Sequence, residues 1–266
     1  MQSQPKLSLP NSWHKLRIQP LVLADQQQLI DESEGLLASA QSGSPAVLAW
    51  SQAAQEGLVL GFSQKAGILN QEALASHPLP IFHRRAGGSA VLVGSHLLGL
   101  DVVLPAGHPL ILPDLVESYR WLGETWVAAL HALGVSARVV PPDEAHEQRG
   151  LLKRPEASAR EEVLRRACYG SLSPYEVVAG KRKVVGLDMI RRRSGTLLQA
   201  GVLLRWNPER LADLLGHTPE EQSLLKEGLQ ERAVGLDTLA GRYVSPGEVV
   251  EAFERALSER TIDIRF

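Results

Sequence analysis

The stretch from Pro80 to Pro105, PIFHRRAGGSAVLVGSHLLGLDVVLP, decides the fold class of this chain of 266 residues. Its apolar runs are short and are separated by glycine-rich turns, which predicts a strand, a tight glycine turn and two more strands. Glycine turns inside strand hairpins argue against a Rossmann phosphate loop, and no G-x-G-x-x-G follows a strand. The stretch therefore favours a sheet built from hairpins over a doubly wound one.

Helices and further strands are expected on both sides of this stretch. Residues 20–40 have the apolar spacing of an amphipathic helix, and residues 45–50 and 57–61 are expected to be short strands. The clearest helix is 114–133, which Asp114 can cap and which ends at a glycine. The second half of the chain is expected to contain a long loop and a helix over 138–167, strands over 175–188 and 196–206, and a helical tail.

Strands and helices mix without a regular βαβ rhythm, so the expected fold class is α+β. A mixed, largely antiparallel β-sheet packed with helices is predicted. The length suits one domain, 1–266, with residues 1–14 as a loose lead-in and residues 207–266 as a helical segment of the same domain.

Bulk composition excludes several classes of function. The net charge is -2, so the basic footprint of a nucleic-acid-binding protein is absent. No apolar run reaches the length of a signal peptide core or a membrane span, which predicts a soluble protein of the cytoplasm with no membrane partner. The single cysteine rules out an intramolecular disulfide and a zinc ribbon, and no H-x-x-x-H occurs, so no metal site is expected.

The first segment that can carry chemistry is the glycine turn with Arg84, Arg85, Gly87, Gly88 and Ser89. Adjacent glycines let the backbone approach a ligand closely. Arginines beside such a turn can anchor a carboxylate, a phosphate or an acyl carbonyl. The alternative is an ordinary hairpin turn whose arginines are solvated.

The second and third segments surround Lys183 and Cys168. Lys183 leads into Val-Val-Gly, so its ammonium can point into the protein, where it needs an acceptor such as a thioester carbonyl. Cys168 follows Arg165 and Arg166, and these two cations and Lys183 are expected to lower the pKa of its thiol and favour the nucleophilic thiolate. The alternatives are a solvated basic turn and a buried, inert cysteine.

Four motifs in this order resemble the lipoate–protein ligase A and octanoyltransferase family. Arg84–Val91, R-R-A-G-G-S-A-V, is similar to the R-R-x-x-G-G-x-A-V element but one residue shorter, and a preceding G-x-x-Q is similar to Gly61–Gln64. The K-[VI]-x-G element is similar to Lys183–Gly186, and G-x-x-L-Q-x-G to Gly195–Gly201. The resemblance covers about residues 20–260 and implies a biotin/lipoate protein ligase fold.

One branch of this family adds a cysteine and an aromatic residue, then Ser-Pro-Tyr-Glu, before the lysine. Here these are Cys168, Tyr169 and the stretch from Ser173 to Glu176. The resemblance implies that Cys168 takes an octanoyl group from octanoyl-acyl carrier protein as a thioester. A lysine of a lipoyl-domain protein, either the glycine cleavage H protein or a 2-oxoacid dehydrogenase E2, then receives it.

The resemblance also assigns roles to single residues. Cys168 and Lys183 are the catalytic pair, with Lys183 binding or polarising the acyl carbonyl. The substrate-binding residues are Arg84, Arg85, Gly87, Gly88, Ser89, Gly186 and Gln199. The apolar walls are assigned to Leu58, Leu60, Val91 and Val185. No cofactor is needed, the protein is expected to be a monomer, and a cationic cluster of Arg154, Arg160, Arg165, Arg166 and Arg191 to Arg193 either steers acidic partners or is simply solvated.

The chain departs from the family pattern at four places. Ser89 stands where the family usually has a third small residue, often glycine. Val93 and Ala200 stand where it often has histidine. Leu187-Asp188-Met189 replaces Ser-Ala-Gln, which changes the acyl pocket, and Asp188 is either a satisfied turn residue or a partner of Arg191 to Arg193.

Two other functions remain open. An ATP-dependent lipoate–protein ligase would use Lys183 and the glycine turn to hold lipoyl-adenylate, would need magnesium and ATP, and would not use Cys168. A non-catalytic paralogue would bind lipoyl domains or acyl carrier protein without regard to Cys168.

Overall fold

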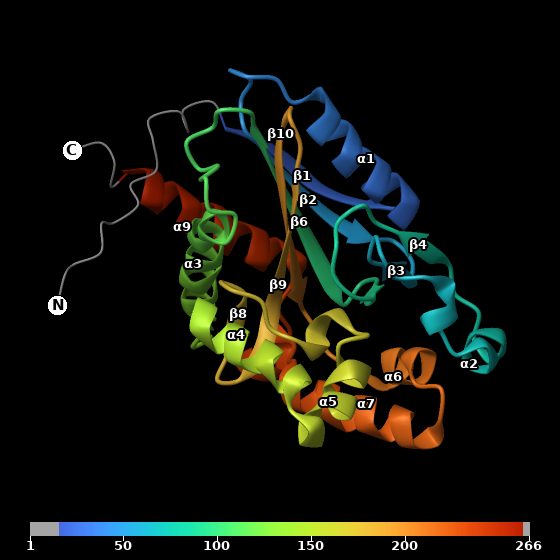
Figure 1. Ribbon diagram of the computed structural model, residues 1–266. Helices are drawn as coiled ribbons and strands as arrows, with labels where there is room; N and C mark the ends of the chain where they lie inside the picture. Colours follow the sequence, from blue (N-terminus) through green and yellow to red (C-terminus); the bar gives the residue numbers. More distant parts are fainter. Residues whose placement is uncertain (1–15, 263–266) are drawn as a thin grey trace.

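A mixed sheet of seven strands forms the centre of the computed structural model, which describes residues 16–262. The first strand pairs parallel to the second, and every other neighbouring pair in this sheet is antiparallel. The sheet order is β1 (Arg17–Ala24), β2 (Val47–Ala53), β6 (Leu97–Pro105), β10 (Gly195–Leu203), β9 (Arg182–Arg191), β8 (Val177–Ala179) and β7 (Arg138–Val139). The predicted mixed, largely antiparallel sheet is confirmed, and the expected lead-in 1–14 lies outside the described residues (Figure 1).

A second sheet of three strands packs against Ala53 of β2 and Leu97 of β6 in the large sheet. Its central strand β3 (Gly57–Leu60) pairs parallel to β4 (Ile81–His83) and antiparallel to β5 (Val91–Val93). The stretch from Pro80 to Pro105 therefore forms β4, the glycine turn, β5 and β6, as its pattern predicts. The connection between β5 and β6 joins the two sheets, whereas the glycine turn between β4 and β5 lies within the small sheet.

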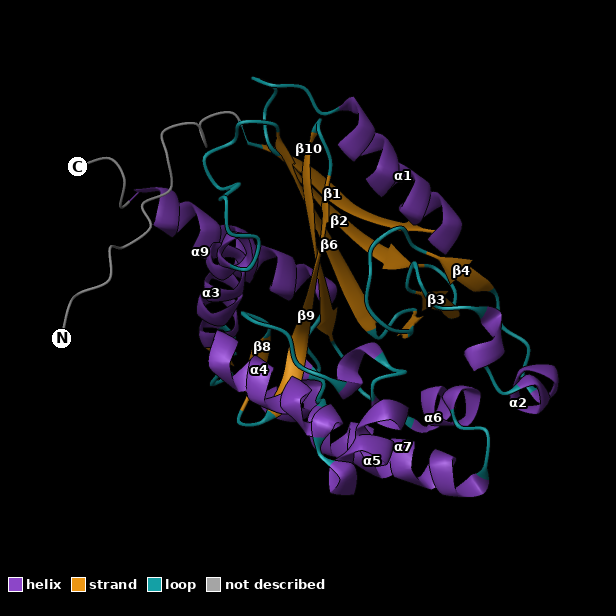
Figure 2. Cartoon of the chain, in the orientation of Figure 1, coloured by secondary structure: helices purple, strands orange, loops and turns teal. Residues whose placement is uncertain are grey.

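The two faces of the large sheet have different partners (Figures 1 and 2). Helices α3 (Glu117–Ala132) and α9 (Pro246–Ile262) cover one face, where Trp126 packs on Phe253 with ring centroids 4.4 Å apart. Helix α1 (Gln26–Ser39) covers the other face. Because side chains alternate along a strand, β10 points its even-numbered residues to α3 and α9 and its odd-numbered residues to the α1 side.

The remaining helices pack around the small sheet and the lower end of the large one. A separate apolar core joins β3 to helices on this side. The elements are α2 (Gln71–Ser76), α4 (Pro142–Gly150), α5 (Pro155–Leu164), α6 (Glu209–Leu215), α7 (Pro219–Arg232) and α8 (Leu236–Ala240), with short 3₁₀ turns at Ala66–Ile68, Leu151–Lys153 and Cys168–Gly170. No helix among residues 16–262 is long and apolar enough to span a membrane.

Two expected elements are wrong. Residues 20–24 belong to β1 rather than to the start of the helix, because they pair with β2, a contact that local spacing does not reveal. The segment 138–167 holds β7, α4 and α5 instead of a long loop and one helix. Helix α4 buries only Ala145, so it shows no apolar periodicity, and it is started by Pro142 at its first position.

Candidate active site

A cavity of about 550 Å³ lies on the α1 side of the large sheet. It is bounded by α1, by the strands β6, β9 and β10, and by the segment around Cys168. The residues predicted for the site that line it are Arg84, Arg85, Gly88, Ser89, Cys168, Lys183, Gly186 and Gln199. Gly87 is absent from this lining, because it occupies the outer side of the glycine turn, where a Cβ would meet nothing within 4 Å.

Backbone hydrogen bonds hold Cys168 against the glycine turn. The Cys168 N–H donates to Ala90 O at 2.8 Å, and the Ala90 N–H donates to Arg166 O at 3.0 Å. Gln64, from the G-x-x-Q motif, donates to the same Arg166 oxygen at 3.2 Å and accepts from the Gly61 N–H at 3.1 Å. Residues far apart in sequence are thereby fixed around the thiol.

The turn requires glycine at Gly88 and at Gly61, the residue that packs against it. Gly88 has φ +84°, a conformation that side chains with a Cβ rarely adopt. A Cβ on Gly61 would lie 2.1 Å from Gly88 O, so the two backbones touch. Arg84 closes the turn by donating to Gly87 O at 2.9 Å and Ser89 O at 3.0 Å. Arg84 is therefore a structural brace of the turn as well as a cavity residue.

Lys183 is inside the protein, with 1% of its surface exposed. Its Nζ lies 2.9 Å from Glu176 Oε2, donates to Cys168 O at 2.9 Å and lies 5.3 Å from the centre of the Tyr169 ring. Glu176 also accepts from the Ser173 N–H at 2.7 Å and the Leu187 N–H at 3.2 Å. The solvated-turn alternative is wrong for Lys183, whose expected inward ammonium has a carboxylate as acceptor.

The surroundings of the thiol differ from the expectation. Burial raises the pKa of Cys168, while the charges of Lys183 and Arg84 act in the opposite direction. Arg166 instead pairs with Glu221, at 2.9 Å between Nη2 and Oε1, and Arg165 is exposed. The prediction that Arg165 and Arg166 lower this pKa is therefore wrong, whereas Lys183, the third predicted cation, does act to lower it. The half-buried thiol lines the cavity, unlike an inert core cysteine.

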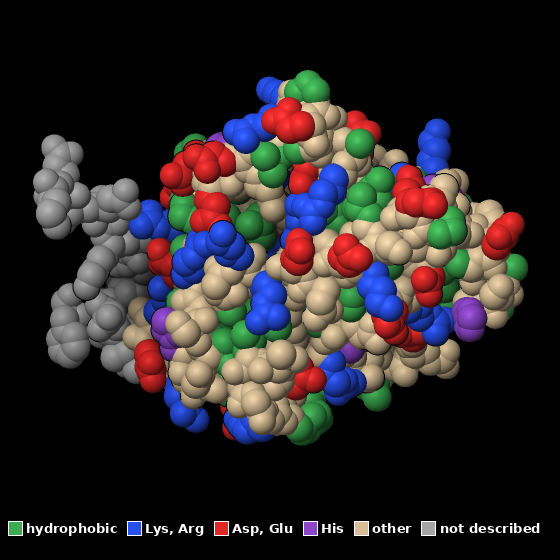
Figure 3. Space-filling view, turned by 90° about the horizontal axis from the view of Figure 1, so that it is seen from below, with side chains coloured by type: hydrophobic (Ala, Val, Ile, Leu, Met, Phe, Trp, Pro, Cys, Tyr) green, Lys and Arg blue, Asp and Glu red, His purple; other side chains and the backbone are tan. Residues whose placement is uncertain are grey.

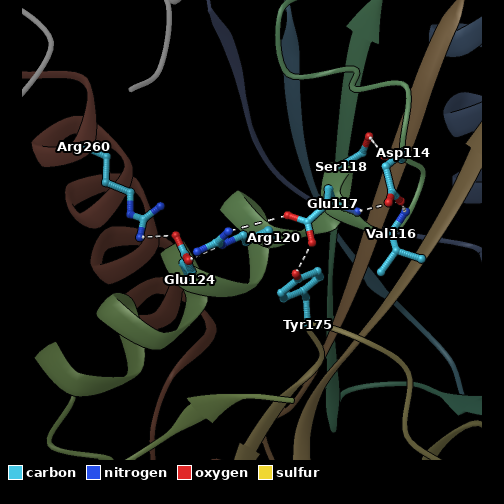
Figure 4. Close-up of polar contacts among 8 residues, drawn as sticks. All are labelled: Asp114, Val116, Glu117, Ser118, Arg120, Glu124, Tyr175 and Arg260. Carbon is cyan, nitrogen blue, oxygen red and sulfur yellow. Dashed lines mark hydrogen bonds and ion pairs between the residues drawn. The ribbon is translucent and has the colours of Figure 1, made fainter. Parts of the chain in front are cut away.

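An unusual backbone conformation positions Glu176. Tyr175, directly before it, has φ +64° and is the only non-glycine residue among those described with a positive φ. Its hydroxyl donates to the Glu117 carboxylate on α3, which also faces Arg120 at 3.6 Å (Figure 4). Burial and the Glu117 contact raise the pKa of Tyr175 to about 12. Helix α3 thus holds the segment that delivers Glu176 to Lys183.

Leu187-Asp188-Met189, which replaces the Ser-Ala-Gln of the family pattern, places the carboxylate of Asp188 in the cavity. Asp188 Oδ2 lies 3.5 Å from Arg84 Nε, so its partner is Arg84 and not a member of 191–193. Gln199 Nε2 donates to Asp101 Oδ1 at 2.8 Å, also in the cavity wall. The predicted substrate residue Gln199 is therefore tied to an acid that the sequence did not single out.

Val93 and Ala200, which stand where the family often has histidine, lie in different parts of the structure. Val93 lies in the apolar part of the cavity wall, whereas the Ala200 side chain belongs to the core under α3 and α9. Among the predicted apolar walls, Val91 lines the cavity. Leu58, Leu60 and Val185 were predicted wrongly: the first two point into the core by α5 to α7, and Val185 into the α3 core.

The cavity residues that sequence reasoning did not assign to the site include Glu176, Asp101 and Tyr119. Glu176 belonged to the quoted Ser-Pro-Tyr-Glu motif but received no role. Asp101 stands alone in the apolar run Leu97–Pro105, and a single acid in such a run is a signal for a buried polar contact. Tyr119 looked like an ordinary member of the apolar face of its helix.

Charged groups on the surface are mixed rather than gathered by sign. On the face in Figure 3, Lys and Arg side chains are interspersed with Asp and Glu. Two members of the predicted cationic cluster are paired, Arg160 with Glu231 at 3.0 Å and Arg166 with Glu221. Within residues 16–262, no group of three or more His, Cys, Asp or Glu side chains is arranged to hold a metal.

The family model for the lipoyl protein ligase A/B catalytic domain matches residues 26–258. The chain is 28% identical to an octanoyltransferase LipM of an Exiguobacterium species, over 93% of this chain and 86% of that one. It is 33% identical to an octanoyltransferase LipM of Kyrpidia tusciae, over 76% of this chain and 70% of that one.

Solved structures agree on the fold. A bipartite lipoate protein ligase from Thermoplasma acidophilum superimposes with a TM-score of 0.71 at 18% identity, covering 92% of this chain and 82% of that one. A lipoate-protein ligase A bound with ATP superimposes with a TM-score of 0.66 at 20% identity, covering 92% and 84%. This chain belongs to the lipoyl protein ligase A/B catalytic-domain family.

Proposed function

We propose that this protein is an octanoyltransferase that moves an octanoyl group from acyl carrier protein, through a thioester on Cys168, to a lysine of a lipoyl-domain protein. It is an acyltransferase by family and by its curated relatives. The observation that carries the rest of the proposal is the position of the thiol. Cys168 lines the cavity next to Lys183 and the glycine turn.

The first step forms a bond between Cys168 Sγ and the carbonyl carbon of the donor thioester. The donor's carbon–sulfur bond breaks, and the carrier leaves as a thiolate that takes up a proton. In the second step the neutral amine of the acceptor lysine attacks the acyl-cysteine. The carbon–nitrogen bond forms, the Cys168 thiolate leaves, and the amine loses its proton, so two moderate barriers replace one high barrier.

Lys183 supplies positive charge where negative charge develops on the acyl oxygen. An ammonium has three N–H donors, and here they face Cys168 O and the two oxygens of Glu176. The acyl oxygen replaces one of these contacts during the reaction. A donor of this kind contributes about 10²–10³ in rate.

The partners that this proposal requires are octanoyl-acyl carrier protein and a lipoyl domain of an H protein or an E2. We propose a cytoplasmic monomer that consists of one catalytic domain and needs no cofactor. Arg84, Arg85, Gly88, Ser89, Gly186 and Gln199 would contact the substrates from the cavity wall, which supports their assignment as binding residues. Gly87 would act only through the shape of the turn.

Intact-mass spectrometry after incubation with octanoyl-acyl carrier protein tests the proposal. The expected result is a gain of one octanoyl group that hydroxylamine removes. Since Cys168 is the only cysteine in the chain, the matched control is Cys168→Ala, which should gain nothing. Addition of a lipoyl domain should discharge the adduct and transfer its mass to the acceptor.

Two results would refute the proposal. The protein would be a ligase if it modified a lipoyl domain only when ATP and lipoate were present and if Cys168→Ala did so at the same rate as the wild type. Binding of lipoyl domains with no transfer from either donor would identify a non-catalytic paralogue.

A further inference from the structure

The floor of the cavity carries a row of polar side chains. Asp101, Gln199 and Asp188 are direct partners on β6, β10 and β9, so their side chains stand on the same face of the sheet. All three line the cavity. An octanoyl chain that lies across this row would present only methylene groups to it and would form no hydrogen bond with its side chains.

The rows on either side of it are not polar. Towards Tyr169, the next row along the strands is Gly99, Gly201 and Gly186, and the Tyr169 hydroxyl donates to Gly201 O at 2.8 Å. On the other side the row is Val103, Leu197 and Ile190. Successive rows on one face are about 6.8 Å apart along an antiparallel strand. The polar row is therefore one step beyond the glycine row beside Cys168 and Tyr169.

Another part of the cavity wall is apolar. Leu29 of α1, Val59 of β3, Val93 of β5 and Leu97 pack together and line the cavity. The lining thus offers both aliphatic side chains and hydrogen-bonding groups. A ligand that matches both has a methylene chain and a polar substituent.

Asp101 has hydrogen-bonding capacity left over. It accepts from Gln199 and from the Ser33 hydroxyl of α1, and no Lys or Arg of residues 16–262 forms an ion pair with it. A carboxylate has about four acceptor sites, of which these contacts use two. Burial raises the pKa of Asp101, although both hydrogen bonds oppose the rise. Gln199 likewise uses one of its two amide hydrogens on Asp101 and keeps its carbonyl oxygen available.

Asp188 completes the row and is held in place. Its Oδ2 faces Arg84 Nε at 3.5 Å, and its Oδ1 accepts from the Met189 N–H at 2.8 Å. An unsubstituted chain lying across the row would remove water from these groups and offer no hydrogen bond in return, which is unfavourable. A hydroxyl group on the chain can donate to Asp101 and accept from Gln199 at once.

We propose that Asp101 and Gln199 determine acyl specificity, so that the cavity takes a medium-chain acyl thioester bearing a hydroxyl on the distal half of its chain in preference to unsubstituted octanoyl. The inference rests on the acyl transfer through Cys168 proposed above. Octanoyl remains a substrate, with a lower kcat/KM. The hydroxyl lies at the polar row, and the methylene groups contact the apolar wall.

The test compares octanoyl-pantetheine with hydroxyoctanoyl-pantetheines that carry the hydroxyl on successive carbons of the distal half of the chain. The rate of Cys168 acylation is followed by intact mass. At least one hydroxylated thioester should exceed octanoyl by about tenfold or more in kcat/KM, because a site that hydrogen-bonds a hydroxyl discriminates strongly against its absence.

Two variants make the assignment specific. Asp101→Leu should reverse the preference, raising kcat/KM for octanoyl and lowering it for the hydroxylated thioester. Asp101→Asn has nearly the same shape, so it keeps the fold testable if the leucine variant fails to fold, and it should reduce the preference several-fold. Circular dichroism of each variant before the assay verifies that it is folded.

The outcomes separate this inference from the proposed function. The inference would be overturned if octanoyl acylated Cys168 at least as fast as every hydroxylated thioester and if Asp101→Asn left the ratio of the two kcat/KM values unchanged. Octanoyl transfer would then remain intact. Asp101 would then only join α1 to the sheet. Absence of any adduct with every thioester would remove the proposed function and this inference with it.

Discussion

Lys183 Nζ lies 2.9 Å from Glu176 Oε2, and both side chains are at most 3% exposed. Burial raises the pKa of Glu176, and the Lys183 charge and the backbone donors of Ser173 and Leu187 oppose this rise. The pair explains how an ammonium can be kept inside the protein beside Cys168. It also makes stability and activity depend on the same two residues.

Lys183→Met should reduce both activity and stability. The acylation rate should fall by about 10²–10³, because the positive charge near the acyl oxygen is lost. Stability should fall by about 3–5 kcal/mol, because Glu176 is left buried without its partner. The double variant Lys183→Met, Glu176→Gln separates the effects: urea unfolding should return most of the stability, while acylation stays low. Recovery of acylation in the double variant would contradict the role of Lys183.

The pH dependence of Cys168 should be shifted upwards. Because the pKa of its thiol is raised by burial, the neutral thiol persists to higher pH and the thiolate-dependent rate is lost as pH falls. Alkylation by iodoacetamide should reach half its maximal rate above the ordinary thiol pKa of about 8.5. Mass spectrometry of the single cysteine reports this directly. A midpoint below that value would show that Lys183 and Arg84 outweigh burial.

Gly123→Ala should destabilise the protein although alanine favours helices. A Cβ on Gly123 of α3 would lie 2.2 Å from Tyr175 O, which is backbone and cannot rotate away. Such overpacking costs about 1–3 kcal/mol and exceeds the helix gain of about 1 kcal/mol. The Tyr175 segment and Glu176 should shift as well, lowering the acylation rate.

Gly35→Ala is the matched control for this variant. Gly35 lies inside α1, and a Cβ there would meet nothing within 4 Å. The same substitution should therefore stabilise the protein by up to about 1 kcal/mol. Urea unfolding of both variants checks these predictions. If both variants changed the free energy of unfolding in the same direction, the contact between α3 and Tyr175 would not be rigid.

The ion pair of Arg166 and Glu221 should contribute stability only above a defined pH. Arg166 lowers the pKa of Glu221 to about 2, below the unfolded value of about 4.3. A depressed carboxyl pKa stabilises the folded state above the unfolded pKa, and this stabilisation is lost as pH falls towards 2. Thermal unfolding of Glu221→Gln should differ from the wild type at neutral pH and converge with it at acidic pH. A difference that persists at pH 2 would argue against the linkage.

The fold class and most of the strands can be predicted from residue patterns alone. Short apolar runs separated by glycine specify hairpins locally, so the elements from Pro80 to Pro105 could be predicted. The order of the motifs also predicts that Cys168, Lys183 and the glycine turn form one site, and in the structure Cys168, Lys183 and Gly88 line one cavity. That the chain is a single domain stays a prediction.

The surroundings of the proposed catalytic residues depend on tertiary contacts that residue patterns do not encode. Arg165 and Arg166 precede Cys168 in sequence but do not act on its thiol. Of the three cations predicted from the sequence only Lys183 does, and Arg84 acts with it because charge acts through space. The pairing of Asp101 with Gln199 depends on the register between β6 and β10, which no local pattern encodes. Residue types and their order were in the sequence. The burial, partners and pKa values of the site were set by which strands and helices came together.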